Sequence, residues 1–186
     1  LRLLNMTHAG QGTGAAAWPA AVVARLTPER YHDAASWTAC TAARAADFSA
    51  VGYFFGKEMV RTQQVPVGLI QCAVGGSPLE SWMRDETLPA AFQVPDWLAN
   101  TATLEPWCLE RARVQLGPRL TAAPGDSMGP NHPFKPSFLW RAGPARLLPF
   151  ALRGVLWYQG ESNALSHLGE AGVTDPAWRV AQHGEL

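Results

Sequence analysis

The sequence predicts an α/β fold built on a parallel sheet, and two stretches carry this prediction. Residues 65–83 and 153–164 each begin with an apolar run and end abruptly in glycine and polar residues. Such runs are typical of parallel strands that are buried on both faces. In open α/β sheets, ligands bind beyond the carboxyl ends of the strands. The polar groups after the two runs are therefore the first candidates for a functional site.

The chain opens with a predicted strand at residues 1–6, followed by a loop at 7–17 that is rich in Gly, Ala and Thr. The glycines of this loop fit neither the dinucleotide fingerprint nor the P-loop, and no lysine follows them. Asp47 or Ser49 is placed to cap a helix that runs to about residue 63. Four apolar side chains repeat at helical spacing and predict a buried stripe, namely Phe48, Val51, Phe55 and Met59.

The next predicted strand lies within residues 65–74 and ends at Gly75 and Gly76. Two adjacent glycines leave backbone N–H groups accessible. Residues 79–83 could open a helix immediately after the turn. This order of strand, glycine turn and helix start places amide donors beside a site able to hold an anion or an oxyanion.

Residues 84–130 have weak periodicity and predict a helical and loop excursion, with helices at about 90–100 and 106–116. Residues 135–140 and 147–152 then return the chain to the sheet, and Val155 to Tyr158 form the last predicted strand. Gln159, Glu161 and Asn163 follow it with amide and carboxylate groups. Beyond residue 164 the apolar pattern degrades.

Several of these segments together resemble sialate O-acetylesterases, which belong to the SGNH (GDSL-like) hydrolases. The matches run in family order over residues 47–83 and again over about 131–164. The resemblance is carried by the blocks Phe48–Glu58, Val65–Ile70, Gly75–Trp82 and Gly154–Ala164, the last containing Trp-Tyr-Gln-Gly-Glu-Ser-Asn.

The resemblance implies a three-layer, flavodoxin-like parallel sheet, present here as a single partial domain over residues 1–186. It assigns the oxyanion hole to the backbone N–H of Gly75 or Gly76 and to the Gln159 side-chain amide. Glu161 and Asn163 either orient Gln159, bind the sugar, or close the turn through backbone bonds. Trp82, like Trp157, is either a sugar-stacking platform or a core residue.

The departures from the family concern the nucleophile and the base. No Gly-Gln-Ser-Asn block, which carries the nucleophilic serine in the family, occurs in this sequence. The family's Asp-x-x-His block is also missing, since the downstream histidines are His167 and His183, and Asp175 is followed by Pro-Ala-Trp. The chain also begins with Leu1 rather than Met, so we expect an inactive fragment of an active enzyme.

Other serines and histidines are weaker candidates. Gly125-Asp126-Ser127 spells the Gly-Asp-Ser of related hydrolases, but it lies in a Pro/Gly loop without a preceding strand and predicts a turn. Ser77 and Ser81 lie near the predicted site, outside any Gly-x-Ser-x-Gly motif. His132 precedes a proline and is expected in a loop or at the surface. A two-carboxylate glycosidase built on Glu80 and Glu161 has little support, because nothing in the sequence fixes their separation.

Composition excludes several functional classes. The formal net charge is zero, with 15 basic and 15 acidic residues scattered along the chain, so no footprint for nucleic acid or an anionic membrane is present. No apolar stretch reaches about 18 residues. Cys40, Cys72 and Cys108 lack metal-ligand spacing and are either plain thiols or, for two of them, a disulfide pair. We expect neither a metal nor a cofactor.

The function expected from the sequence is hydrolysis of O-acetyl esters of sialic acid or a related sugar, by a serine esterase. The ligand is then a small or oligosaccharide acetyl ester. One alternative is a non-catalytic, carbohydrate-binding or structural remnant of the same fold, and another is a xylan-type acetylesterase. The resemblance is compatible with a secreted or periplasmic enzyme, but the sequence fixes neither the compartment nor the oligomeric state.

Overall fold

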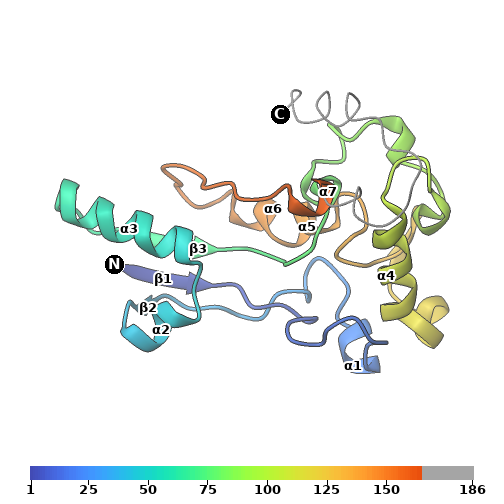
Figure 1. Cartoon of the computed structure of the whole chain (residues 1–186), viewed down its shortest axis with the longest axis horizontal. Coiled ribbons are helices and arrows are strands. Elements are labelled where there is room, and N and C mark those ends of the chain that lie inside the picture. Colours follow the sequence, from blue (N-terminus) through green and yellow to red (C-terminus); the bar gives the residue numbers. More distant parts are fainter. Residues whose placement is uncertain (165–186) are drawn as a thin grey trace.

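The structure is a computed structural model that describes residues 1–164. Its central element is a mixed sheet with the order β2-β1-β3 (Figure 1). Strand β1 (Arg2–Asn5) pairs in parallel with β3 (Gly68–Gln71) and antiparallel with β2 (Thr38–Ala39). The sheet and the surrounding helices confirm the α/β class. Both predicted strands in the first half of the chain are present.

The parallel pair positions the site. Its register runs from Arg2 opposite Gly68 to Asn5 opposite Gln71, so both strands end at the same edge of the sheet. The connection between them contains α2 (Ala42–Ala46) and α3 (Ala50–Gln63), of which α3 contacts β3. The chain segments that follow the two strands therefore leave the sheet at the same edge.

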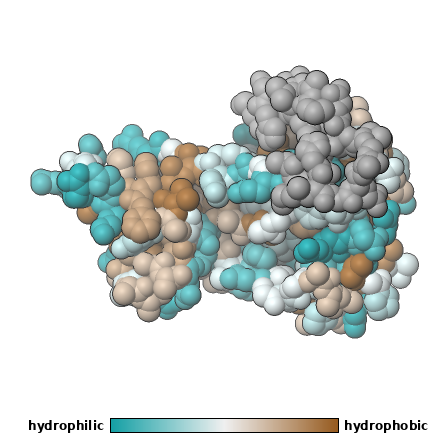
Figure 2. Space-filling model, viewed as in Figure 1, coloured by the Kyte–Doolittle hydropathy of each residue, from teal (hydrophilic) through white to brown (hydrophobic). Residues whose placement is uncertain are grey.

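Helix α3 begins where its cap predicts, because the Ser49 hydroxyl accepts a hydrogen bond from the N–H of Gly52 at 3.2 Å. The predicted stripe is confirmed at Phe48, which is buried, and Met59 is half-buried, but the prediction is wrong for the two residues between them. Val51 is 49% and Phe55 44% exposed, and the buried position of the helix is Gly56. A Cβ at Gly56 would lie 2.7 Å from Leu69 Cδ1. The helix therefore packs against the strand through Gly56, and the side chains of Val51 and Phe55 remain exposed to solvent. Figure 2 shows apolar surface over this part of the molecule.

The excursion after β3 is mostly short turns and one regular helix. Helix α4 (Pro106–Leu116) has its predicted bounds. The predicted helix at 90–100 is instead two 3₁₀ turns, η2 (Ala90–Phe92) and η3 (Trp97–Ala99), because Pro95 interrupts the backbone hydrogen bonds between them. The remaining described elements are α1 (Ala20–Val23), η1 (Leu79–Trp82), η4 (Gly117–Ala122), β4 (Gly125–Asp126), β5 (Gly129–Pro130), α5 (Phe138–Ala142), α6 (Pro144–Leu147) and α7 (Glu161–Ala164).

The predicted last strand is absent from the described structure. Residues 151–160 are irregular, and they form the arm that leaves α6 and returns to α7 in Figure 1. Val155 is 75% and Tyr158 77% exposed. The apolar residues of this segment indicate that it favours burial, but a strand also needs a neighbouring strand to pair with. Within residues 1–164 the segment pairs with no strand. The predicted return of residues 147–152 to the sheet is wrong for the same reason.

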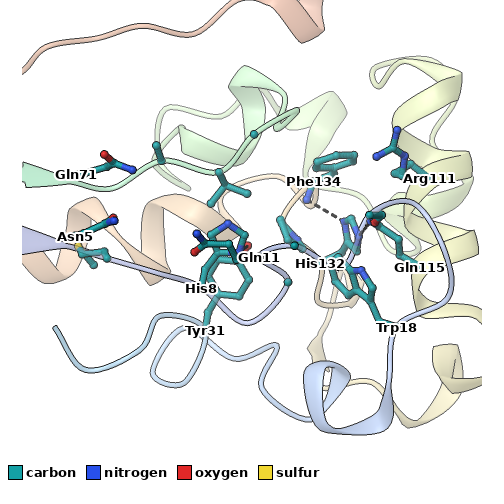
Figure 3. A pocket seen from close by; sticks show the side chains of 18 residues that line it. Asn5, His8, Gln11, Trp18, Tyr31, Gln71, Arg111, Gln115, His132 and Phe134 are labelled. Carbon is teal, nitrogen blue, oxygen red and sulfur yellow. Dashed lines mark hydrogen bonds between the residues drawn. The ribbon is translucent and has the colours of Figure 1, made fainter. Parts of the chain in front are cut away.

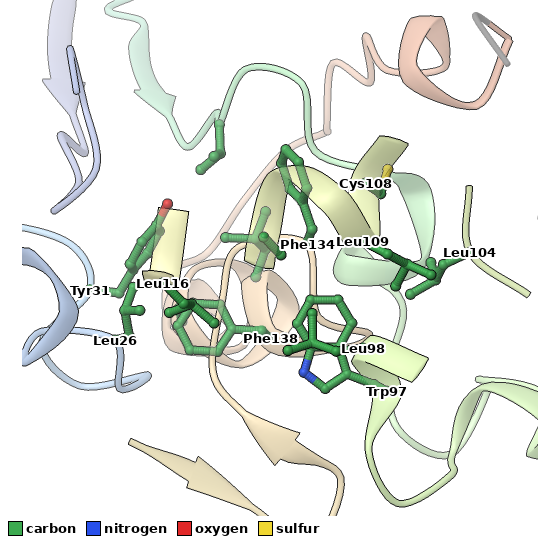
Figure 4. Packing of buried hydrophobic residues seen from close by; sticks show 14 of the residues in the cluster. Leu26, Tyr31, Trp97, Leu98, Leu104, Cys108, Leu109, Leu116, Phe134 and Phe138 are labelled. Carbon is green, nitrogen blue, oxygen red and sulfur yellow. The ribbon is translucent and has the colours of Figure 1, made fainter. Parts of the chain in front are cut away.

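The main hydrophobic core lies beside the sheet, between the excursion and the loops that follow β1. Side chains from α4, η3 and α5 pack together in it (Figure 4). Trp97 is fully buried, and its indole N–H donates to the carbonyl of Pro130 at 2.7 Å. The segment that the sequence had placed outside the sheet therefore contributes a large share of the core. None of the described helices is both long and apolar enough to cross a membrane.

The core position of α4 generates a stability prediction. Leu109 is completely buried in this helix, whereas Val114 is 42% exposed five residues later. We expect Leu109→Ala to lower the free energy of unfolding in urea by about 2–5 kcal/mol, because it removes buried methyl groups and leaves a cavity. The matched control Val114→Ala should change it by less than about 0.5 kcal/mol. Equal losses in the two variants would contradict the assignment of this core.

Candidate functional site: a glycine turn beside a polar cavity

The turn after β3 exposes two backbone donors. The N–H of Ser77 donates to the carbonyl of Val74 at 3.4 Å, which closes a four-residue turn over the two glycines. Gly76 has φ +74°, the conformation that this position of a type II turn requires and that favours glycine. Neither Gly75 nor Gly76 donates its N–H to another described residue. Two amide donors are therefore available at the end of the strand.

Side chains after the turn hold its shape. The hydroxyl of Ser77 donates to the carbonyl of Val74 at 2.7 Å and accepts from the indole N–H of Trp82 at 2.8 Å. The hydroxyl of Ser81 donates to the carbonyl of Pro78 at 2.7 Å. Both serines are buried. Their hydroxyl protons are committed to backbone carbonyls, so the geometry gives neither serine a nucleophilic role.

Asn163 connects this turn to a segment more than eighty residues away. Its Oδ1 accepts from the backbone N–H of Leu79 at 2.9 Å, and its Nδ2 donates to both carboxylate oxygens of Glu80 at 3.2 Å. A backbone N–H can only donate, and an ionised carboxylate can only accept. These two partners therefore fix which end of the Asn163 amide faces which neighbour.

The orientation of Asn163 in turn fixes Gln159. The Nε2 of Gln159 donates to Asn163 Oδ1 at 2.8 Å and more weakly to the carbonyl of Ser77 at 3.4 Å. The opposite end of the amide, Oε1, is buried without a hydrogen-bond partner among the described residues. Gln159 thus lies against the residue that follows the two glycines, and one of its two amide hydrogens is held only by a long contact.

The other predicted site residues differ in how the structure places them. Glu161 is exposed in the first turn of α7. Trp82 is half-buried, packs against the core and meets the ring of Trp157 edge to face at 6.3 Å. These contacts give Trp82 a packing role, and its sugar-stacking role stays a prediction. His167, Asp175 and His183 lie outside the described residues.

A cavity of about 460 Å³ lies where the two parallel strands end. Asn5 and Gln71 border it from the ends of β1 and β3, and Gly75 borders it from the turn. Loop and helix residues complete its wall, with Arg111 and Gln115 from α4 toward one end and His8, Gln11 and Tyr31 toward the other (Figure 3). Its volume is in the range of small-molecule sites.

His132 is the central buried polar group of the cavity wall. Its Nδ1 accepts from the N–H of Phe134 at 3.0 Å, so its Nε2 carries the proton and donates to Gln115 Oε1 at 2.9 Å. The Nε2 of Gln115 then donates to the carbonyl of Gly14 at 2.7 Å. Burial, and secondarily the charge of Arg111, lower the pKa of His132 to about 3. His132 lies in a loop as expected, but it is completely buried rather than at the surface.

A second histidine faces the cavity from the loop after β1. The Nδ1 of His8 lies 3.2 Å from the hydroxyl of Tyr31, and its ring stacks on the Tyr31 ring. Burial, and then the neighbouring His32, lower the pKa of His8 to about 4. Both cavity histidines are therefore neutral at pH 7. No described serine hydroxyl is hydrogen bonded to either ring.

The Gly-Asp-Ser sequence contributes to a two-stranded hairpin: Gly125 and Asp126 form strand β4, and only Ser127 lies in the predicted turn. It opens the β4–β5 hairpin, in which Asp126 accepts from the N–H of Met128 at 2.9 Å and from Arg141 at 2.9 Å. The buried Lys135 ammonium also donates to Asp126. The aspartate is thus a structural acceptor, and Ser127 beside it is exposed.

The three cysteines are free thiols. Burial raises the pKa of Cys72 to about 12, and burial also raises that of Cys108, so neither thiol is activated. Among residues 1–164, no group of three or more His, Cys, Asp or Glu side chains is arranged to hold a metal ion.

Sequence reasoning missed the contribution of the excursion to this site. Arg111 and Gln115 belong to no motif and lie in the segment that was interpreted as an excursion, and His132 was expected only in a loop or at the surface. The available signal was the spacing of Arg111 and Gln115, which places both on one face of the predicted helix 106–116. His132 offered no such signal.

The fold and the site define an α/β domain that presents amide donors at the end of a strand, an arrangement found in ester hydrolases. Comparison with protein families gives a match to "Carbohydrate esterase, sialic acid-specific acetylesterase" over residues 5–117. This match covers more than half of the chain, and the chain belongs to this carbohydrate esterase family.

Individual relatives agree with the family. The sialate O-acetylesterases of Pongo abelii and Homo sapiens are each 32% identical over 139 residues, which are 73% of this chain. The Mus musculus enzyme is 34% identical over 119 residues. The chain spans only about 22% of the length of the first two relatives. The crystal structure of a carbohydrate acetylesterase from Xanthomonas citri has a TM-score of 0.48 and 26% identity, and the comparison covers 88% of this chain and 25% of that one.

The bridge made by Asn163 leads to a measurable prediction. Replacing Asn163 by Ala removes the acceptor of the Leu79 N–H, so we expect amide hydrogen exchange at Leu79 to become about tenfold faster. Glu161→Gln, an exposed change in the same helical turn, should leave that rate unchanged. Unchanged protection of Leu79 in Asn163→Ala would mean that the two segments are not joined through this amide.

Burial of His132 predicts how its ring titrates. In proton NMR, its Hε1 resonance should keep its neutral position from pH 8 to about pH 5 and move only near pH 3. Imidazoles of the urea-unfolded chain, with pKa near 6.5, provide the reference. Because the unfolded ring binds a proton below that pH and the folded ring does not, this histidine makes the fold less stable as the pH falls from about 6.5 toward 3. A folded-state midpoint near 6.5 would contradict the buried placement.

Proposed function

We propose that this chain forms the oxyanion-stabilising part of a carboxylic-ester hydrolase that removes O-acetyl groups from sugars. One observation carries the proposal: Asn163 joins the two distant blocks, so that the Gln159 amide lies 3.4 Å from the Ser77 carbonyl, directly after two glycines with free N–H groups. Family membership supports the same chemistry.

Acyl transfer to water passes through a tetrahedral intermediate whose oxygen carries negative charge. In our proposal, the N–H of Gly75 or Gly76 donates to that oxygen without any rearrangement, because these groups have no acceptor among residues 1–164. Gln159 adds a second donor by turning one amide hydrogen away from the Ser77 carbonyl. The bond to Asn163 is retained, which keeps Gln159 in place during the reaction.

The nucleophile and the base are assigned to the Gly-Gln-Ser-Asn and Asp-x-x-His blocks of the family, which this sequence does not contain. Within residues 1–164, Ser77 and Ser81 are bonded to carbonyls, and the cavity histidines contact Tyr31 and Gln115. By itself, the 186-residue chain is then expected to retain donors without a nucleophile, and to be inactive.

The proposed substrate is an acetyl ester of sialic acid or a related sugar. The names of the relatives support this class, and the cavity beside Gly75 has a suitable size. Asn163 acts by positioning Gln159, and Glu161 is exposed beside it, where a sugar hydroxyl can reach its carboxylate. For Trp82 we keep sugar stacking as the proposed role, beside the packing contacts that the structure shows. We further propose that the three strands belong to a three-layer SGNH-type domain, of which residues 1–186 are a part.

To test the proposal, the coding DNA on either side of this segment is read for the Gly-Gln-Ser-Asn and Asp-x-x-His blocks. A longer protein that includes both missing blocks should hydrolyse O-acetylated sugars. In it, we expect Gln159→Ala to lower kcat about 10²- to 10³-fold with little change in KM, because one oxyanion donor is lost. Gln63→Ala, which removes an exposed amide from the end of α3, is the matched control and should leave kcat unchanged.

The isolated 186-residue chain provides the second arm of this test. It should hydrolyse 4-nitrophenyl acetate at the buffer rate and should not react with a fluorophosphonate serine probe. Labelling of a serine in this chain would contradict our proposal that the nucleophile lies outside these 186 residues. Flanking DNA without either block would instead favour the non-catalytic remnant.

A further inference from the structure

The geometry points to Arg111 as the residue that makes the cavity select sugars carrying a carboxylate over neutral sugars. This inference rests on the proposed function for its sugar ligand, but it concerns binding and does not require turnover. The positive charge proposed for the cavity also contrasts with the formal net charge of the whole chain, which is zero.

The charges that line the cavity have one sign. No aspartate or glutamate is among its lining residues, and Arg111 is the single lysine or arginine among them. His8 and His132 are neutral at pH 7, as their lowered pKa values of about 4 and about 3 require. The described wall therefore presents one positive charge and no negative charge to a ligand.

The Arg111 side chain has no partner that would neutralise it. It makes no hydrogen bond or ion pair with another described residue, whereas Arg113 on the same helix donates to the carbonyl of Leu98 and lies 3.9 Å from Glu110. Arg111 precedes Gln115 by one helical turn, so both face the same side of α4 (Figure 3). Because Gln115 is held by His132 and Gly14, this side of the helix is fixed against the cavity.

A guanidinium recognises a carboxylate through two parallel N–H bonds, and this pairing is stronger than one between neutral groups. His8 Nε2 and the Gln11 amide are among the cavity groups with no hydrogen-bond partner in the described residues, and they lie away from Arg111 in Figure 3, where they suit sugar hydroxyls. A sugar that spans the cavity can therefore place its carboxylate at α4 and its hydroxyl groups near the loop after β1. Sialic acids and uronic acids share this chemistry.

The experiment measures binding to the purified chain by ligand-observed NMR, with four probes at pH 7. These are N-acetylneuraminic acid, its methyl ester, glucuronic acid and its methyl ester. We expect at least one acid to bind about ten- to a hundredfold more tightly than its own ester, since esterification removes the charge and little else. The acid that shows this preference identifies the source of the carboxylate.

Three variants assign the preference to its residue. Arg111→Gln should abolish it, Arg111→Lys should retain part of it, and Arg44→Gln, an exposed arginine of α2 outside the cavity, should leave it intact. Circular dichroism establishes whether each variant is folded. If Arg111→Gln is unfolded, the reduced preference of Arg111→Lys is the result that tests the inference. Equal affinity for acid and ester, no binding of any probe at millimolar concentration, or an undiminished preference in Arg111→Gln would overturn the inference. Because no ester is cleaved, none of these results depends on the proposed catalysis.

Discussion

The site depends on the amide of one side chain, Asn163, which joins two parts of the chain that are distant in sequence. A neutral amide suits this position because it must accept from the backbone N–H of Leu79 and donate to the carboxylate of Glu80 at the same time. An aspartate would place a second negative charge against Glu80, and an aliphatic residue would leave buried polar groups unpaired. The position of Gln159 beside the glycine turn follows from this bridge.

Most of the residues that line the cavity come from segments outside the three-stranded sheet. Strands β1 and β3 contribute to the cavity only their last residues, Asn5 and Gln71. The rest of the wall comes from α4 and from the His132 loop, which are joined to the loop after β1 by the hydrogen-bonded chain from His132 through Gln115 to Gly14. The excursion therefore supplies much of the main core and, together with the His132 loop, one wall of the cavity.

These features differ in how far the sequence could predict them. The glycine turn, β1, β3, the cap of α3 and the bounds of α4 are local, because propensity and turn chemistry over a few residues determine them. The strand at 155–158 and the stripe through Val51 and Phe55 failed because both required a partner. An apolar pattern says that a residue prefers burial, whereas Gly56 and the pairing of β3 decide which residues are covered.

The proposed oxyanion donors differ in the hydrogen bonds that they already make. The N–H groups of Gly75 and Gly76 have no acceptor in the described part of the chain, so donation to a developing oxyanion costs them no bond seen there. Gln159 must first give up its contact with the Ser77 carbonyl, but that contact is 3.4 Å long and therefore weak. The shorter bond to Asn163 Oδ1 prevents the amide from rotating freely when the weak one is released. The turn is thus a preformed donor, and Gln159 is a donor whose direction is set by Asn163.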